Sequence, residues 1–262
     1  MAIPIITLTT DLGLKDYYVP SAKGYILSKL PSANIIDITH QIKPFRIDEA
    51  SYALKGCYED FPKGSIHIVS VDATTGRGTR FLAAKSKDHF FLCHDNGFIS
   101  LVVEDEDMEE IVDLPFNDEG LIFPLKNILV PAAIKIFETG SISQIGVPVS
   151  NYVRKANMRP LIEESIIRGA VIYIDNLGNA ITNIDKQNFD RFSKGRKFRI
   201  NFSRADYFDK ISLHYNEVPE GEKVCLFGSN GFLEIAINKG SCANLLGIKT
   251  DHSIFIEFLR KG

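Results

Sequence analysis

Four short polar clusters carry the side chains of this sequence that could do chemistry, and each of them follows an apolar run. Residues 11–16 hold two carboxylates, and residues 72–80 combine a carboxylate with hydroxyl groups and two arginines. Residues 175–179 and 228–231 supply carboxylate, amide and hydroxyl groups beside glycines. Such groups can recognise a polar ligand, and a carboxylate can also act on water as a general base.

Each cluster by itself is also compatible with an ordinary turn, because Asp can cap the following helix and Gly supplies a positive φ. The glycine-rich stretch 72–80 follows an expected strand, as phosphate-binding loops do. However, neither G-x-x-x-x-G-K-[ST] nor G-x-G-x-x-G occurs in the chain. Phosphate binding therefore has little support, and a function is indicated only by the clusters taken together.

The elements that must position the first two clusters follow from hydrophobic periodicity. Apolar, β-branched runs are typical of buried strands, and apolar spacings of three and four residues are typical of helices. These patterns predict strands at 3–9, 34–38 and 65–71, with helices at 18–30, 47–60 and 128–138. This alternation favours an α/β domain with a largely parallel sheet. Asp11 and Asp72 then lie at the carboxyl ends of strands, where such sheets bind ligands.

A β-hairpin is expected within residues 81–97. The stretches 81–84 and 90–93 are apolar, and Asn96-Gly97 is a strong signal for a type I′ turn. We therefore expect the chain to reverse direction at residues 95–97.

The character of the sequence changes after an irregular stretch around residues 147–165. Beyond it, short β-rich runs separated by Gly, Asn, Asp and Pro indicate a small barrel or sandwich. These runs lie at 166–174, 197–202, 223–227, 232–236 and 253–258. We predict an α/β protein with a Rossmann-like N-terminal α/β domain at 1–150, a linker at 151–164 and a smaller C-terminal β-barrel domain at 165–262.

Composition argues against several classes of protein. With 45% hydrophobic and 24% charged residues, the chain can build an ordinary core. The net charge of −3 and the absence of a basic stripe argue against a nucleic-acid partner. The four cysteines lack zinc spacing, so we expect no metal. Without a signal-peptide pattern or a run near the ~18 to 20 apolar residues of a membrane span, we expect a cytoplasmic protein and no membrane partner.

Taken together and in order, the clusters resemble one family, the enzymes that attack C5′ of S-adenosylmethionine (SAM). These are the SAM hydroxide adenosyltransferases, or SAM hydrolases, and their relatives the fluorinase and the chlorinase. The matching stretches are Leu8–Gly13 with Asp16, Ile36–His40 with Pro44, Glu49–Ala50, Phe61–Gly64, Asp95–Gly97, Pro131–Ala133, Asp175–Ile184 and Gly228–Ala236. A single stretch of this kind is weak support, whereas eight in register are strong support.

The resemblance implies how the first domain would hold SAM, which is a substrate, with no cofactor. The carboxylate at the position of Asp11 bonds both ribose hydroxyls in the family. Phe45 takes the place of an aromatic residue that packs on the substrate. Asp16 faces the methionine ammonium, because opposite charges attract.

The resemblance also implies a contribution from the second domain. Its substrate-binding positions are Asp175, Leu177, Asn179, Ser229, Asn230 and Asn238. Asp175 and Ser229 would join Asp16 at the ammonium, and Leu177 and Asn179 would meet the adenine. In this family the pocket forms between subunits of a trimer, so a homotrimer is expected.

The resemblance is incomplete in the stretch that carries catalysis. Hydrolases of the family share an Asp–Arg–His set that positions and polarises water, and Asp72 matches its Asp. Thr79 stands where the Arg would be, Arg80 aligns with a second family Arg, and Pro124 replaces the His. Thr75 matches a threonine among the halide-contacting residues of the fluorinase. The candidate catalytic residues are therefore Asp72, Thr75 and Arg80.

Three hypotheses follow. The first is a SAM hydrolase that uses water at C5′ to give adenosine and methionine. The second is a SAM- or adenosine-binding protein with weak or no turnover, since Thr79 and Pro124 replace catalytic residues. The third and most distant is a halide-using 5′-halogenase; Asp72 argues against it, because a carboxylate beside a halide is repulsive by about 1 to 4 kcal/mol.

Two further choices stay open. Arg77 is an alternative to Arg80 as the replacement for the missing arginine. His94 is an alternative base, whereas His40 and His67 are expected to be core or turn histidines.

Overall fold

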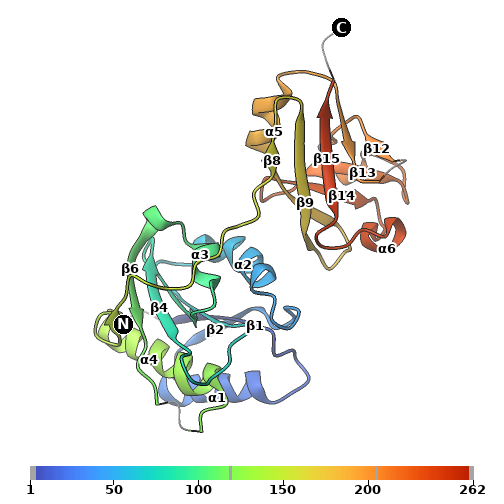
Figure 1. Cartoon of the computed structure of the whole chain (residues 1–262). Coiled ribbons are helices and arrows are strands. Elements are labelled where there is room, and N and C mark those ends of the chain that lie inside the picture. The colour runs from blue at the N-terminus through green and yellow to red at the C-terminus, as the bar shows by residue number, and fades with distance from the viewer. Residues whose placement is uncertain (1–3, 118–119, 204–205, 260–262) are drawn as a thin grey trace. The chain divides into compact units, whose positions relative to one another are not determined.

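The computed structural model describes residues 4–117, 120–203 and 206–259 (Figure 1). The chain divides into two compact units, residues 1–157 and residues 158–262. The linker predicted at 151–164 includes the junction of the two units, and its limits stay a prediction. Within the described ranges, no helix combines the length and apolar character that crossing a membrane requires.

In its described residues, the N-terminal unit contains a seven-stranded mixed sheet with the order β2-β1-β3-β5-β4-β6-β7. The strands are β1 (Ile5–Thr10), β2 (Asn34–Thr39), β3 (Ile66–Ser70), β4 (Phe81–Ser86), β5 (His89–His94), β6 (Met108–Asp113) and β7 (Val147–Pro148). β2, β1, β3 and β5 are parallel, whereas the pairings of β4, β6 and β7 are antiparallel. The predicted α/β unit with a parallel-containing sheet is confirmed.

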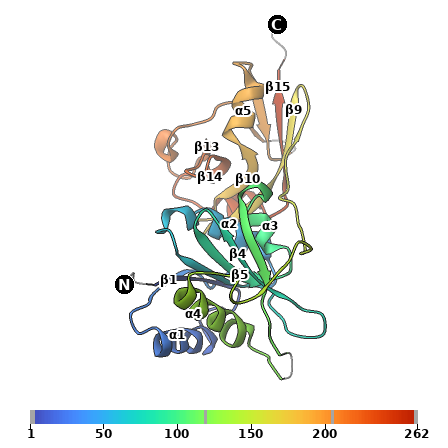
Figure 2. The same ribbon diagram turned by 90° about the vertical axis from the view of Figure 1, so that its left-hand side faces the viewer.

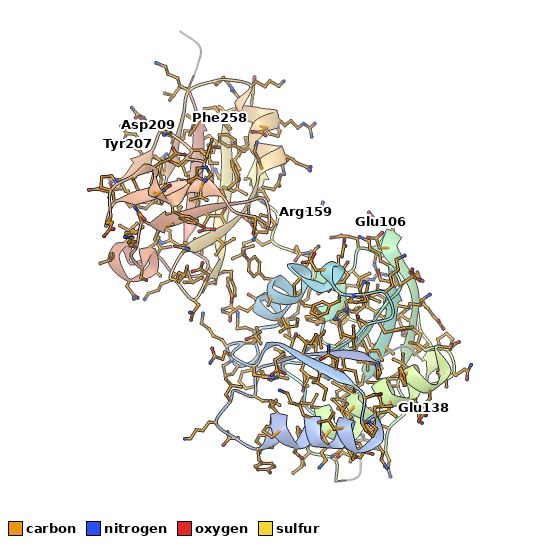
Figure 3. The ribbon with its side chains drawn as sticks, turned by 180° about the vertical axis from the view of Figure 1, so that it is seen from behind. Glu106, Glu138, Arg159, Tyr207, Asp209 and Phe258 are labelled. Atoms are coloured by element: carbon orange, nitrogen blue, oxygen red, sulfur yellow. The ribbon has the colours of Figure 1, made fainter. Side chains whose placement is uncertain are left out.

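Helices cover both faces of this sheet (Figure 2). The helices on one face are α1 (Tyr18–Lys29), the π-helical turn η3 (Leu125–Leu129) and α4 (Val130–Thr139); those on the other are α2 (Ile47–Lys55) and α3 (Phe98–Val102). The central strands β1 and β3 are buried on both sides, and besides their apolar side chains they bury threonines, a histidine and a serine. Figure 3 shows the side chains that fill both layers, with Glu106 and Glu138 at the surface.

Two local predictions for this unit differ from the structure. The helix predicted at 47–60 ends at Lys55, and the 3-10 turn η1 (Tyr58–Asp60) follows it. A second 3-10 turn, η2 (Asp105–Asp107), precedes β6. The hairpin prediction placed the reversal at 95–97, and this was wrong. The β4–β5 hairpin turns at Lys87 and Asp88, whose φ angles of 49° and 63° fit a type I′ turn.

The C-terminal unit is an antiparallel, barrel-like sheet. Its strands are β8 (Leu161–Ile162), β9 (Ile166–Ile174), β10 (Ala180–Asp185), β11 (Phe198–Asn201), β12 (Tyr207–Phe208), β13 (Lys223–Phe227), β14 (Phe232–Ile237) and β15 (Ser253–Phe258). The order is β12-β11-β15-β9-β10-β14-β13, with β8 paired to β9. A bridge between Ser212, just after β12, and Leu226 on β13 links the two ends of this order and nearly closes the sheet.

In the described part of this unit, three short helices accompany the sheet: α5 (Lys186–Ser193), η4 (Tyr215–Glu217) and α6 (Cys242–Leu246). The five predicted β-rich runs correspond to β9, β11, β13, β14 and β15, so the β-rich character of the C-terminal unit is confirmed. Asp185 caps α5 by accepting the backbone N–H of Asn188.

A buried pair of histidines links three strands of the N-terminal unit. His67 on β3 is fully buried, and its Nδ1 lies 2.8 Å from Oγ1 of Thr7 on β1. Its Nε2 lies 3.1 Å from Nδ1 of His89 on β5. Burial, together with the neighbouring His89 ring, lowers the pKa of His67 to about 3. The expected core position of His67 is thus confirmed.

This pair makes the fold sensitive to acid. An ordinary histidine titrates near pH 6.5, so between pH 6.5 and 3 the unfolded chain binds a proton at His67 that the folded chain does not. Stability therefore falls as the pH falls through this window. We expect the free energy of unfolding to be about 2 kcal/mol lower at pH 5 than at pH 7.5 from His67 alone.

Urea unfolding at a series of pH values checks this prediction. His67→Phe should flatten the pH dependence of the free energy of unfolding, whereas His214→Asn at an exposed histidine should leave it unchanged. An unchanged slope in His67→Phe would contradict the prediction.

Candidate active site

In the first polar cluster of the N-terminal unit, one carboxylate oxygen of Asp11 binds two other segments of the chain. Oδ2 of Asp11 accepts the backbone N–H of Phe45 at 3.0 Å and that of Asp72 at 3.2 Å. Thr10 and Ser70 are paired at the ends of the parallel strands β1 and β3, so Asp11 and Asp72 follow at the same edge of the sheet. The structure thus brings together three of the predicted site residues.

Two residues of this cluster adopt a backbone conformation that non-glycine residues rarely occupy. The φ angle is 69° at Phe45 and 49° at Asp72. Such conformations persist where surrounding contacts hold them, and they are frequent at functional sites. Phe45 is 68% exposed, so it is available to a ligand.

A chain of side chains fixes the loop that carries Asp11. The Nδ1 of the buried His40 lies 2.9 Å from Oγ1 of Thr10, and its Nε2 lies 3.0 Å from Oδ1 of Asp37. These two contacts hold the ring between the Thr10 hydroxyl and the Asp37 carboxylate. The carbonyl of His40 also accepts the N–H of Gly13 at 2.8 Å. His40 is therefore buried, as expected, and it also holds the loop of residues 10–13.

Among the side chains that fix this loop, Asp37 carries the negative charge. Its carboxylate also pairs with the Lys23 ammonium at 2.5 Å. Partial burial opposes ionisation, but hydrogen bonds and charges from Lys23 and His40 hold the pKa of Asp37 below its ordinary value. The family pattern gives His40 no role, whereas its contacts with Thr10 and Asp37 show that it holds the loop.

The backbone of Asp72 is held on both sides. While its N–H donates to Asp11, its carbonyl accepts from Nδ1 of His94 at 3.0 Å and from Nδ2 of Asn96 at 3.4 Å. The Asn96 amide also donates to the carbonyl of Val71 at 3.1 Å. These contacts explain why Asn96-Gly97 does not form the hairpin turn. The Asn96 side chain instead donates hydrogen bonds to the residues that directly follow β3.

The remaining residues of the 72–80 loop make contacts of their own. The Thr75 hydroxyl donates to the carbonyl of Leu121, and the Thr79 hydroxyl donates to that of Gly76 at 2.7 Å. Arg80 forms an ion pair with the buried Asp95 carboxylate. It also donates to the carbonyl of Asn151 at 2.7 Å.

The two arginines considered for the missing catalytic position differ in environment. The Arg80 guanidinium is paired with Asp95 and its side chain is 31% exposed, whereas Arg77 is exposed in the same loop. Asp16 is likewise exposed in the loop before α1, where it is accessible to a cationic group.

In the C-terminal unit, Asp175 organises the turn between β9 and β10. Its Oδ1 accepts the backbone N–H groups of Leu177 at 2.9 Å and Asn179 at 2.8 Å, and its Oδ2 accepts Nδ2 of Asn179 at 2.9 Å. Gly178 has a φ of 84°, and a Cβ there would lie 2.1 Å from Oγ of Ser241. The turn therefore requires glycine, and it exposes 72% of Leu177.

A buried carboxylate of this unit, Glu234 on β14, is not among the site residues expected from the sequence. Tyr215 donates its hydroxyl to Oε1 at 2.7 Å, and Oε2 lies beneath Gly228, 3.0 Å from where a Cβ would stand. Burial raises the pKa of Glu234 and the nearby charge of Asp175 raises it further, against the Tyr215 hydrogen bond. An acidic residue within the apolar run 232–237 was the available signal.

The other predicted residues of this unit lie around Glu234 and at the far end of its strand. Ser229 and Asn230 are exposed in the turn that precedes β14, and Oδ1 of Asn230 accepts the N–H of Phe232 at 3.1 Å. Asn238 follows β14 and donates from Nδ2 to the carbonyl of Val218 at 2.8 Å. Across residues 4–117, 120–203 and 206–259, no cluster of three or more His, Cys, Asp or Glu is arranged to hold a metal ion.

The fold and the site define a two-unit protein in which an α/β unit and an antiparallel, barrel-like unit each present carboxylates at strand ends. Residues 6–146 match the SAM hydroxide adenosyltransferase N-terminal domain, and residues 169–255 match the corresponding C-terminal domain. The chain therefore belongs to the SAM hydroxide adenosyltransferase family, which confirms the resemblance found in the sequence.

Similar proteins cover nearly the full chain. An (R)-S-adenosyl-L-methionine hydrolase of Methanocaldococcus jannaschii is 28% identical, over 94% of this chain and 93% of its own length. A fluorinase of an Actinoplanes species is 22% identical, over 97% of each chain. A solved structure of an uncharacterized conserved protein from Thermotoga maritima superimposes with a TM-score of 0.86 at 31% identity, over 96% of this chain and 99% of that chain.

Proposed function

We propose that this protein is a SAM hydrolase that converts SAM and water into adenosine and methionine. The observation that carries the proposal is the Asp11–Asp72 arrangement at the end of β1 and β3, in a chain of this family. Similar proteins named (R)-S-adenosyl-L-methionine hydrolase extend over more than nine-tenths of the chain. Because the similarity to these hydrolases extends over nearly the whole chain, it supports assigning the same activity to this protein.

The reaction is a displacement at C5′. The oxygen of water forms a bond to C5′ while the C5′–S bond breaks, and the bonding electrons remain on sulfur as neutral methionine. Because the leaving group is neutral, the demanding task is to place and deprotonate the water. We propose that Asp72 orients this water and takes its proton, which then passes to solvent.

The two oxygens of Asp11 divide their tasks in this proposal. Oδ2 is used by the amides of Phe45 and Asp72, which leaves Oδ1 for the ribose hydroxyls. The exposed Phe45 ring then packs on the substrate, and Asp16 faces the methionine ammonium. One carboxylate would thus bind the sugar and set the position of Asp72.

The second half of the proposed site comes from the C-terminal unit. Asp175, Leu177, Asn179, Ser229, Asn230 and Asn238 would bind the adenine and the amino-acid end of SAM. We propose that a homotrimer forms, in which the Rossmann-like unit of one subunit and the barrel unit of another hold the same SAM molecule. We also propose a cytoplasmic protein that needs no cofactor and has no nucleic-acid or membrane partner.

Loss of the family's arginine and histidine supports one alternative. Thr79 donates its hydroxyl to Gly76 within its own loop, and Pro124 has no group that acts on water. A SAM- or adenosine-binding protein with little turnover is therefore the second candidate. Thr75 and Arg80 would support Asp72 in the first candidate, with Thr75 fixed to the Leu121 carbonyl.

Product analysis separates these functions. Purified protein is incubated with each sulfonium epimer of SAM, and chromatography follows adenosine and methionine in equal amounts. Adenosine release supports the hydrolase, and a thermal shift with SAM without release supports the binding protein. A 5′-halo product in halide buffer would favour the halogenase instead.

A further inference from the structure

We propose that His94 is a positioning residue that holds the carbonyl of Asp72 and thereby aims the Asp72 carboxylate at the water. The inference rests on the proposed function of Asp72. It assigns a role to a histidine that the sequence pattern suggested only as an alternative base.

The geometry at Asp72 carries the inference. A φ of 49° is uncommon for a residue with a side chain, and at Asp72 contacts on both sides of the residue hold it. The N–H is held by Asp11 at 3.2 Å, and the carbonyl is held by His94 at 3.0 Å and Asn96 at 3.4 Å. With both ends of its backbone fixed, the Cα–Cβ direction of Asp72 is fixed as well.

The donor on His94 is also determined. A backbone carbonyl only accepts hydrogen bonds, so Nδ1 of His94 carries a proton. That nitrogen cannot take a proton from water while it donates to Asp72. The contact at Nδ1 therefore serves to position Asp72.

The position of His94 is itself set by the sheet. His94 is the last residue of β5 and is paired with Phe81 on β4, whose ring lies 5.1 Å from the imidazole between centroids. Burial lowers the pKa of His94, against the charges of Asp72 and Asp95, so the ring is neutral at neutral pH. Asn96 is held in turn, because its oxygen accepts the N–H of Phe98 at 3.2 Å.

Two substitutions at residue 94 separate the effect of the hydrogen-bond donor from the effect of side-chain size. His94→Leu removes the donor, whereas His94→Asn keeps an amide N–H near the place of Nδ1. We expect His94→Leu to lower kcat for adenosine release by about 10- to 100-fold, since small misplacements of a catalytic group have effects of this size. KM should change by less than about 3-fold, and His94→Asn should recover most of kcat.

A matched control exists in the C-terminal unit. His252 also points a ring nitrogen at a backbone carbonyl, that of Phe202, at 2.6 Å. His252→Leu removes the same kind of contact far along the chain from Asp72, and it should leave kcat unchanged.

A double-mutant cycle tests whether His94 acts through Asp72. In an Asp72→Asn background, His94→Leu should lower kcat no further. An equal loss in both backgrounds, or no recovery by His94→Asn, would overturn the positioning role.

A second readout does not depend on turnover. Long-range ¹H–¹⁵N spectra of histidine-labelled protein report the tautomer of the neutral ring, with the His94 signals assigned by their loss in His94→Leu. We expect the Nδ1–H tautomer, and an Nε2–H tautomer would refute the inference. If the wild-type protein released no adenosine, the proposed function would fail, and the tautomer would still decide whether His94 holds Asp72.

Discussion

Asp72→Asn is expected to lower kcat for adenosine formation by about 100- to 1,000-fold while leaving KM for SAM within about 3-fold. The amide has the shape of the carboxylate but cannot take a proton from water. Asn tolerates a positive φ well, and the backbone contacts of residue 72 to Asp11, His94 and Asn96 do not involve its side chain. Steady-state chromatography of adenosine measures both constants.

The chain offers a matched control for this substitution. Asp88 also has a positive φ, 63°, and lies in the β4–β5 turn, before the strand whose opposite end carries His94. Asp88→Asn should keep wild-type kcat, because it makes the same chemical change away from the site. Wild-type turnover in Asp72→Asn would show that this carboxylate does not act on water, and it would favour Arg77 or another group as the catalytic one.

Asp11→Ala is expected to weaken SAM and adenosine binding by about 100-fold or more. A hydrogen bond to a charged group contributes about 1.5 to 3 kcal/mol, and a loss of about 3 kcal/mol corresponds to about 100-fold in Kd. The alanine removes the proposed ribose contacts, and it also leaves the amides of Phe45 and Asp72 without their acceptor. Turnover should therefore fall together with affinity.

Isothermal titration with adenosine measures this effect without requiring catalysis. Asp11→Asn should fall between wild type and alanine, because its amide oxygen can still accept from Phe45 and Asp72 while its nitrogen cannot accept from ribose. Glu138→Ala removes an exposed carboxylate of the same unit and serves as the control (Figure 3). Wild-type affinity in Asp11→Ala would place the sugar elsewhere.

Local sequence was sufficient for most of the elements. The helix at α1 was predicted within a residue of its observed ends, and β9, β13 and β15 were predicted at their observed limits. Local signals mark these segments: Pro31 follows α1, Gly228 follows β13, and buried and exposed residues alternate along β15. The strand β10 and helix α5 were not predicted, since their polar residues mask the pattern.

The hairpin between β4 and β5 shows where local signals fail. Asn96-Gly97 has a higher turn propensity than Lys87-Asp88, yet the chain turns at the latter pair. Pairing of Ser86 with His89 places the turn there, and the Asn96 amide is used at Val71 and Asp72. Contacts distant in the sequence outweighed the local preference.

By itself the sequence determined the two-part organisation, the family and the identity of the polar clusters, because these depend on residue types and their spacing along the chain. Only the tertiary structure decided that one Asp11 oxygen joins Phe45 to Asp72, that Arg80 is paired with Asp95, and that His94 holds Asp72. These contacts join residues 15 to 61 positions apart. They form only where strand register and the direction of each side chain bring donors within about 3 Å of acceptors, and no local pattern encodes that distance.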